Sequence, residues 1–272
     1  MIKMIVSDLD GTLLDHSKKV SRREIDALKR IQAAGIELCL ASGRMHVEMQ
    51  QVMQEIDFEA HSVSQNGAFV HVKDGTRLFT HFFSPELAYE VYQVVKEFDM
   101  VKLICTGDAN YTVTMDSATA EIQARMFQPF IVKEDVGAAL QSDMRSCKFS
   151  FFGKVEVLMQ VKEALQQKFG EQLDIYMADH DCLDVMPQNV SKGSSLLVLL
   201  EHLGLRPEEV ACVGDSFNDV SMFGITPNSY AMKTAHRDVQ LASAYQVHSV
   251  AEAIEHAFAA SKFFESRGTQ TS

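Results

Sequence analysis

The sequence predicts an α/β protein with a Rossmann-like core, a parallel sheet with helices on both faces, interrupted by an inserted α+β domain. Strand-like apolar runs alternate with helix-like amphipathic segments at the start of the chain and again near its end. The pattern changes between residues 82 and 184, where strand pairs replace the alternation. At 272 residues and 46% hydrophobic, the chain can bury two cores. We therefore expect one domain from residues 1–81 and 185–272, and a second from 82–184.

The first forty residues predict a βαβ unit. The apolar run that begins the chain is followed by Ser21-Arg22-Arg23-Glu24, which has the residue types of a capping box at a helix start. Apolar residues at helical spacing follow, and Gly35 is expected to end this helix. The apolar segment 36–41 then forms a second strand, which a right-handed crossover makes parallel to the first.

The alternation continues with a helix near 46–56, a strand at 61–65 and a hairpin-type turn at Gln65-Asn66-Gly67-Ala68. Past Pro187 the core pattern resumes. A helix is expected over Lys192–Leu203, and the wholly apolar strand Val210–Gly214 suits burial on both faces of a sheet. We assign no function to the polar tail, residues 261–272.

Within the insert, Ser84-Pro85-Glu86 is expected to start a helix and Gly107-Asp108-Ala109-Asn110 to form a turn between strands. A strand is predicted over 145–152 and a helix over 154–169. These local patterns together predict an α+β unit.

Composition excludes several classes of function. The net charge of -12 opposes a nucleic-acid binder, which needs clustered Lys and Arg to displace counterions. The five cysteines are odd in number and form no Cys-x-x-Cys pair, as expected of reduced core residues. No apolar run reaches the roughly 20 residues that span a bilayer, and Met1 leads straight into a strand. We expect a cytoplasmic protein with no membrane contact and no obligate protein partner.

Two acids follow the first strand in Asp8-Leu9-Asp10-Gly11. Acids at the carboxyl end of a buried strand lie where open α/β sheets form their ligand crevices. An ordinary Asp/Gly turn remains the alternative interpretation. An EF-hand loop beginning at Asp8 is excluded, because Leu13 and Lys19 stand where glycine and glutamate are required.

A second acidic cluster, Gly214-Asp215-Ser216-Phe217-Asn218-Asp219, follows strand 210–214. In a parallel sheet these carboxyl ends share one edge, so Asp8, Asp10 and Asp215 are expected to converge as oxygen ligands suited to Mg²⁺. No His/Cys pattern indicates zinc. A helix cap is the alternative for Asp215.

Two further segments indicate anion binding. Ser42-Gly43-Arg44 lies between a strand and a helix and offers a hydroxyl and backbone N–H groups at a helix start. Lys192 opens a helix, where a cation is disfavoured unless an anion is bound beside it. A simple cap and a solvated lysine are the respective alternatives.

The motifs Asp8-Leu9-Asp10-Gly11-Thr12, Ser42-Gly43-Arg44, Lys192-Gly193 and Gly214–Asp219 resemble the four ordered motifs of the haloacid dehalogenase superfamily. The resemblance spans the whole chain. The insert after Asn66-Gly67-Ala68, with Leu183-Asp184-Val185-Met186-Pro187 before the lysine motif, is similar to that of the Cof-type phosphatases of subfamily IIB, which carry a C2B cap.

This resemblance implies an Mg²⁺-dependent phosphomonoesterase acting on small phosphorylated metabolites. Asp8 would attack phosphorus and form an aspartyl-phosphate, and Asp10 would protonate the leaving alcohol and then deprotonate water. The implied metal ligands are Asp8, the backbone carbonyl of Asp10, and Asp215. The implied phosphate contacts are Ser42, the amides of Leu9 and Gly43, Lys192 and Asn218. Asp219 would orient Lys192 or the metal waters.

The chain also departs from the family pattern. Lys233-Thr234-Ala235 stands where relatives commonly carry Gly-Asn-Ala, and Val247-His248-Ser249-Val250 replaces a usual Thr-x-Asn run. Lys233 would add a cation for a second anionic group, or be a surface lysine. The identity of the substrate is therefore not to be inferred from that of a relative.

The insert is expected to act as a lid that supplies substrate contacts. Its candidate residues, each of which has a plain surface or core interpretation, are Lys102, Arg125, Lys148, His180 and Asp181. Two alternative functions stay open. A phosphosugar mutase uses the same intermediate but returns the phosphate to a sugar. A phospho-accepting signalling or binding domain also accepts phosphate on an aspartate, but such a domain is shorter and has no lid.

Overall fold

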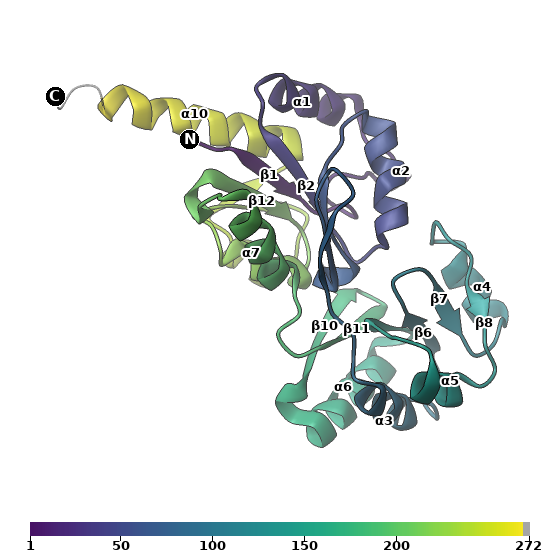
Figure 1. Cartoon of the computed structure of the whole chain (residues 1–272). Coiled ribbons are helices and arrows are strands. Elements are labelled where there is room, and N and C mark those ends of the chain that lie inside the picture. Colours follow the sequence, from purple (N-terminus) through teal and green to yellow (C-terminus); the bar gives the residue numbers. More distant parts are fainter. Residues whose placement is uncertain (269–272) are drawn as a thin grey trace. The chain divides into compact units, whose positions relative to one another are not determined.

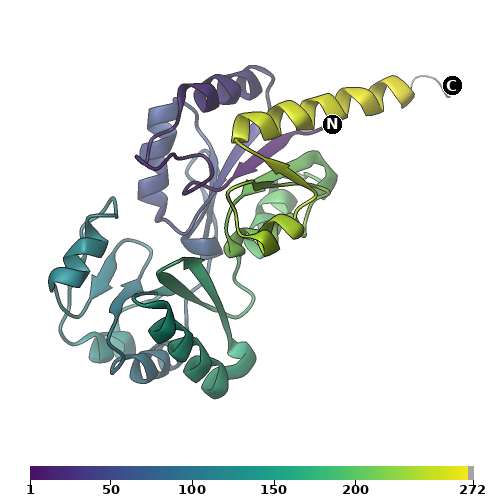
Figure 2. The same cartoon turned by 180° about the vertical axis from the view of Figure 1, so that it is seen from behind.

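The computed structural model describes residues 1–268, with side chains through residue 259; residues 269–272 of the polar tail lie outside it. The chain divides into two compact units. The first comprises residues 1–44, 49–79 and those from 192 onward, and the second comprises 45–48 and 80–191. In Figures 1 and 2 the first unit combines the purple-to-blue start of the chain with its green-to-yellow end.

The first unit contains, in the described residues, an eight-stranded sheet of order β14-β13-β12-β1-β2-β3-β4-β5. From β14 to β3 every neighbouring pair is parallel, and β4 runs antiparallel to β3. The parallel sheet predicted from the sequence is therefore confirmed. The strands are β1 (Met4–Ser7), β2 (Glu37–Ala41), β3 (His61–Ser64), β4 (Phe69–His71), β5 (Arg77–Thr80), β12 (Val210–Gly214), β13 (Asn228–Met232) and β14 (Tyr245–Val247).

Helices cover both faces of this sheet. One face packs its apolar side chains against α1 (Arg22–Ala33), α2 (His46–Ile56) and α10 (Val250–Gly268). The other packs against α7 (Lys192–Leu203), α8 (Val220–Phe223) and α9 (Arg237–Leu241). Short 3₁₀ turns complete the unit: η1 (Gln65–Gly67), η3 (Pro207–Glu209) and η4 (Phe217–Asp219). This is the predicted doubly covered core.

Strand order brings distant segments of the chain together. β1 lies between β2 and β12, and Ser7 pairs with both Leu40 and Val213. Figure 1 shows these three strands side by side. Because all three are parallel and in register, the residues that follow them lie at one edge of the sheet.

The start of α1 departs in part from the sequence prediction. The Ser21 hydroxyl accepts a hydrogen bond from the Glu24 N–H at 3.3 Å, as a capping box requires. The Glu24 carboxylate, however, accepts from the Ala251 N–H of α10 at 2.7 Å. A carboxylate at a helix N-terminus is favourable there. The reciprocal half of the predicted box is therefore wrong, because Glu24 caps a different helix.

The second unit contains a six-stranded sheet of order β10-β11-β9-β6-β7-β8 in the described chain, antiparallel except for the β7–β8 pair. Helices α3, α5 and α6 pack against one face of it. The predicted α+β character of the insert is confirmed. Its elements are α3 (Pro85–Val95), β6 (Val101–Cys105), β7 (Asn110–Thr112), α4 (Ser117–Gln123), β8 (Ile131–Val132), α5 (Val136–Ser142), β9 (Lys148–Phe152), α6 (Val155–Phe169), η2 (Gly170–Gln172), β10 (Leu173–Asp179) and β11 (Cys182–Pro187).

Among the described residues, every helix is too short or too polar to span a lipid bilayer.

Candidate active site

Asp8 and Asp10 follow β1 at the edge that β12 and β2 share. Asp8 is buried, and its N–H donates to the Val213 carbonyl at 2.9 Å. Gly11 has φ +80, and a Cβ atom there would collide with the Asp215 carboxylate. Glycine thus permits a conformation that L side chains rarely adopt and lets the first acidic loop approach the second.

Lys192 is buried between two carboxylates. Its Nζ lies 2.7 Å from Asp8 Oδ1 and 2.7 Å from Asp219 Oδ1, and its side chain is 0% exposed. Burial opposes the charge, but the two carboxylates prevail and raise the pKa of the ammonium group. The solvated-lysine alternative is therefore wrong, since a buried lysine charge persists only when it is paired.

Asp219 uses both of its carboxylate oxygens within the protein. Oδ1 contacts Lys192, while Oδ2 accepts from the N–H groups of Asp215 at 2.9 Å and Ser216 at 3.0 Å. Ser216 and Asp219 form the capping box of η4, so the helix-cap alternative for Asp215 does not apply. Asp219 therefore fixes both Lys192 and the loop that carries Asp215.

Carboxylate oxygens of Asp8, Asp215 and Asp219 lie within 4.8 Å of one another. Burial and the Asp219 charge raise the pKa of Asp215 to about 7. Burial also raises the pKa of Asp8, against the opposing charge of Lys192, with Asp219 and Asp215 adding to the rise. The single ammonium group of Lys192 does not compensate the negative charge of these three carboxylates. Carboxylate oxygens are ligands that suit Mg²⁺. The residues present fit such an ion. Asp8 and Asp215 offer carboxylate oxygens as ligands, whereas both oxygens of Asp219 already contact groups of the protein.

The Asp10 side chain lies outside this carboxylate group. Arg44 donates to it from Nε at 2.6 Å and from Nη2 at 2.5 Å, and Lys18 Nζ donates at 2.6 Å. Burial raises the pKa of Asp10, but the hydrogen bonds and charges of Arg44 and Lys18 outweigh it and lower the pKa to about 2. The acidic pattern alone predicted that Asp10 converges with Asp8 and Asp215 as an oxygen ligand. For the Asp10 side chain this is wrong, because Arg44 and Lys18 hold it. The family resemblance implied an acid–base role for this side chain and a metal-binding role for the backbone carbonyl.

Sequence reasoning missed Lys18 and gave Arg44 no role. Arg44 was visible as the last residue of the Ser42-Gly43-Arg44 motif, but no local pattern pairs it with Asp10. Lys18 has φ +62 in a tight turn closed by hydrogen bonds between Asp15 and Lys19. This turn carries the Lys18 ammonium group to Asp10.

Three of the predicted phosphate-binding residues, Ser42, Gly43 and Asn218, lie around Asn66. The Asn66 N–H donates to the Ser42 carbonyl at 3.0 Å, and Asn218 Nδ2 donates to Asn66 Oδ1 at 3.1 Å. A Cβ on Gly43 would lie 3.1 Å from the same Asn66 oxygen. Asn66 is fully buried, with φ 55, a left-handed conformation that asparagine tolerates. The sequence indicated only a turn at Asn66. In the structure, this residue connects the loop after β2 with the loop after β12.

Leu9 turns its side chain into the core, where it is 0% exposed. Its carbonyl accepts from the N–H groups of Thr12 at 3.3 Å and Leu14 at 2.8 Å. Thr12 in turn donates its hydroxyl to Asp215 Oδ1 at 3.2 Å. Only backbone atoms of Leu9 are therefore suited to the phosphate contact predicted for it.

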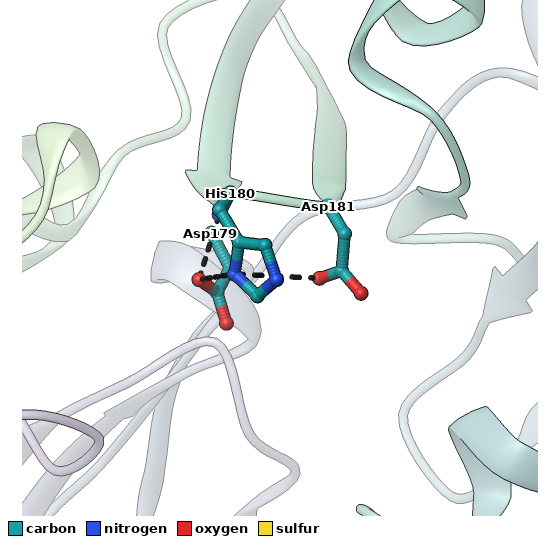
Figure 3. Close-up of side chains that lie close together, drawn as sticks. All are labelled: Asp179, His180 and Asp181. Atoms are coloured by element: carbon teal, nitrogen blue, oxygen red, sulfur yellow. Dashed lines mark hydrogen bonds and ion pairs between the residues drawn. The ribbon is translucent and has the colours of Figure 1, made fainter.

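The hairpin between β10 and β11 carries another charged group in the second unit, drawn in Figure 3. Asp179, His180 and Asp181 each offer a ligand atom within 4.8 Å of the others. His180 Nδ1 lies 2.8 Å from Asp179, and Arg125 pairs with Asp181 at 2.5 Å. The arginine already compensates this acidic group, so the geometry by itself does not indicate a metal ion.

Lys148 and Lys102, two more candidates in the insert, have partners inside the second unit. Lys148 Nζ lies 3.5 Å from the Asp184 carboxylate, both side chains are buried, and Ser150 donates to Asp184 at 2.5 Å. Lys102 donates to the carbonyls of Phe98 and Met100. Both lysines therefore have a structural explanation within the insert.

Comparison with known proteins identifies the family of the chain. A family model described as haloacid dehalogenase-like hydrolase matches residues 5–258. The HMP-PP phosphatase of Klebsiella pneumoniae (strain 342) is 27% identical over 235 residues, covering 86% of this chain and 85% of that protein. Phosphatase YwpJ of Bacillus subtilis (strain 168) is 26% identical over 285 residues, covering 94% and 99%.

The fold is also similar to that of solved structures. The crystal structure of a haloacid dehalogenase-like hydrolase from Bacteroides thetaiotaomicron matches with a TM-score of 0.82 at 27% identity, covering 94% of this chain and 99% of that chain. The fold, the ordered motifs and the family match lead to one conclusion. The chain belongs to the haloacid dehalogenase-like hydrolases, of the Cof type, and is a phosphatase.

Proposed function

We propose that this phosphatase hydrolyses phosphomonoesters of small metabolites, sugar phosphates or phosphorylated cofactors, with Mg²⁺ as cofactor and an aspartyl-phosphate on Asp8 as intermediate. The observation that carries the proposal is the buried cluster in which Lys192 joins Asp8 and Asp219 beside Asp215. Such a concentration of negative charge is costly unless cations compensate it, and the same cations would compensate the charge of a bound phosphoryl group.

Asp8 would be the nucleophile. Lys192 contacts one of its carboxylate oxygens at 2.7 Å and fixes the orientation of the carboxylate. Burial raises the pKa of Asp8, whereas a nucleophile must be ionised. The ammonium group of Lys192 opposes that rise and favours the reactive carboxylate.

Asp10 would protonate the leaving alcohol and then take a proton from the water that attacks the intermediate. Arg44 and Lys18 hold its carboxylate by three hydrogen bonds. Their charges favour the ionised form, which accepts the proton from water, and they make the carboxyl group, when it carries that proton, a strong acid toward the leaving oxygen. The first displacement breaks the ester P–O bond and uses the protonated carboxyl group. The second breaks the P–O bond of the aspartyl-phosphate and uses the carboxylate, so one residue serves both proton transfers.

Mg²⁺ would be held by the Asp8 and Asp215 carboxylates and the Asp10 carbonyl. When bound, it neutralises the phosphoryl oxygens so that an anionic nucleophile can approach an anionic substrate. The Ser42 hydroxyl, the Leu9 and Gly43 amides, Lys192 and Asn218 would bind those oxygens. The second unit would act as the lid that selects the leaving group.

A screen of phosphorylated metabolites for phosphate release, with and without EDTA, tests the proposal. HMP-PP belongs in the screen because the Klebsiella relative is named for it. We expect release with several small phosphomonoesters, lost with EDTA and restored by Mg²⁺. Activity that survives EDTA would contradict the metal assignment. An isomerised sugar phosphate without free phosphate would indicate a mutase instead.

A further inference from the structure

Two basic side chains lie together at the carboxyl ends of β13 and β14. Lys233 directly follows β13 and His248 directly follows β14. Lys233 Nζ lies 3.0 Å from His248 Nε2, and both residues are exposed. In the described part of the chain, neither side chain lies within 4.0 Å of a carboxylate. A lysine paired with a histidine rather than an acid is unusual in a chain of net charge -12.

The backbone holds this pair in place. The Lys233 N–H donates to the Val247 carbonyl at 2.8 Å, and Gln240 Nε2 donates to the Lys233 carbonyl at 2.9 Å. Glu252, the nearby acid, accepts from the His248 backbone N–H at 2.7 Å. That hydrogen bond directs the Glu252 carboxylate to the start of α10 and not to the ammonium group. The Lys233 charge therefore remains available to an external anion.

The pair lies along the same sheet edge as the carboxylate cluster. β13 is the parallel neighbour of β12, with Gly214 paired to Ala231, so Asp215 is level with Met232. Lys233 is the next residue. β12 lies between β13 and the strand β1 that precedes Asp8. Because neighbouring strands are about 4.8 Å apart, the ends of β13 and β14 lie roughly 10–14 Å from the end of β1. A substrate that reaches both places therefore carries its second acidic group at the far end from the phosphoester.

His236, a third basic residue at this edge, already has partners. Its Nδ1 accepts a hydrogen bond from the Asp238 N–H at 3.2 Å as the cap of α9. The centroid of its ring lies 5.3 Å from the centroid of the Phe217 ring. Among the side chains that the structure describes, Lys233 and His248 have only each other as partners, which separates them from an ordinary capping histidine.

We propose that Lys233 and His248 form a subsite for a second anionic group, a phosphate or a carboxylate, on the substrate whose phosphoester is cleaved at Asp8. The inference rests on the proposed function and narrows its substrate class to bisphosphates and phosphorylated acids. An anion between the two side chains accepts hydrogen bonds from the ammonium group of Lys233 and from a ring N–H group of His248.

The test compares three six-carbon substrates: glucose 6-phosphate, 6-phosphogluconate and glucose 1,6-bisphosphate. The unmodified protein is expected to show kcat/KM about tenfold higher for at least one of the last two, because charge-assisted hydrogen bonds of this kind contribute about 1.5 kcal/mol. Preference for 6-phosphogluconate indicates a carboxylate, and preference for glucose 1,6-bisphosphate indicates a phosphate.

Lys233→Met is expected to remove most of this preference through a rise in KM, and Lys233→Arg to retain it. The matched control Lys29→Met removes an exposed lysine of α1 and should leave the preference unchanged. Equal kcat/KM values for all three substrates, or a preference that survives both Lys233→Met and His248→Gln, would overturn the inference while phosphate release still supports the proposed function.

Binding provides a test without turnover. Calorimetric titration of the Asp8→Asn protein with glucose 1,6-bisphosphate and with glucose 6-phosphate should show tighter binding of the bisphosphate, lost in Asp8→Asn/Lys233→Met. Equal affinities contradict the subsite whatever the outcome of the kinetics. Failure of the proposed function is a separate result, in which the unmodified protein releases no phosphate from any of the three substrates.

Discussion

Arg44 donates two hydrogen bonds to the Asp10 carboxylate, from Nε to Oδ2 at 2.6 Å and from Nη2 to Oδ1 at 2.5 Å. The two residues come from the loops after β2 and β1, and Arg44 is only 10% exposed. A planar guanidinium that binds both oxygens fixes the plane of the carboxylate as well as its position. The proposed acid–base group is therefore oriented before a substrate arrives.

Replacing Arg44 tests this orientation. Arg44→Met should lower kcat about 100-fold with little change in KM, since positioned acid–base catalysis contributes 10²–10⁴-fold. Arg44→Lys should recover only part, because lysine cannot bind both oxygens in one plane. Steady-state kinetics measure both, with Arg30→Met on α1 as the control. Unchanged kcat in Arg44→Met would show that Asp10 needs no such clamp.

Asp8→Asn should reduce phosphate release by more than about 1,000-fold, because an amide cannot attack phosphorus. The fold should persist, since Lys192 keeps its pairing with Asp219. Circular dichroism and phosphate release together separate loss of chemistry from loss of folding. Asp26→Asn, in an exposed ion pair of α1, is the matched control. Near-normal turnover by Asp8→Asn would exclude Asp8 as the nucleophile.

Asp10→Ala should slow hydrolysis of the intermediate and let it accumulate. The variant lacks the group that takes a proton from the attacking water. Rapid mixing with radiolabelled p-nitrophenyl phosphate, whose leaving group departs without a proton, followed by acid quench, should leave label on the protein in Asp10→Ala and little in the unmodified protein. The double variant Asp8→Asn/Asp10→Ala should carry none. Equal turnover of Asp10→Ala and unmodified protein would contradict the assignment.

Lys192→Met should destabilise the fold by about 3–5 kcal/mol near neutral pH, because it leaves Asp8 and Asp219 buried without their counter-charge. Urea unfolding measures the free energy. Lys29→Met, which removes an exposed lysine, should stay within about 0.5 kcal/mol of the unmodified protein. A Lys192→Met loss as small as that of Lys29→Met would mean that these carboxylates are protonated or hydrated in the native protein.

Mg²⁺ binding should strengthen as pH rises from 5.5 to 8. Burial and the Asp219 charge raise the pKa of Asp215 to about 7, above its unfolded value near 4. The contribution of this group to stability is therefore full below pH 4 and is lost as pH rises through 7. Mg²⁺ competes with the proton that Asp215 holds below that pH.

Thermal unfolding with and without Mg²⁺ measures this coupling. The increase in Tm on adding Mg²⁺ should be larger at pH 8 than at pH 5.5. In Asp215→Asn, which carries no titrating carboxyl at this position, the increase should be small at both pH values. A Tm increase independent of pH in the unmodified protein would place the ion elsewhere.

Local patterns in the sequence determined the order of helices and strands, the parallel core and the α+β insert. The wholly apolar run Val210–Gly214 and the helix over Lys192–Leu203 are examples, and their observed bounds match the predicted ones. Periodicity of two or 3.6 residues depends on neighbours along the chain, so the sequence contains it directly. The placement of Asp8 and Asp215 at strand ends followed from the same patterns.

Only the tertiary structure decided which of these residues are paired. Lys192 and Asp8 are 184 positions apart, and nothing local distinguishes this buried lysine from a solvated one. The same holds for Arg44 with Asp10, for Asn66 with Asn218, and for Glu24, which caps α10 instead of its own helix. A pairing energy depends on distance and burial in three dimensions, and the chain acquires both only when the sheet brings its strand ends to one edge.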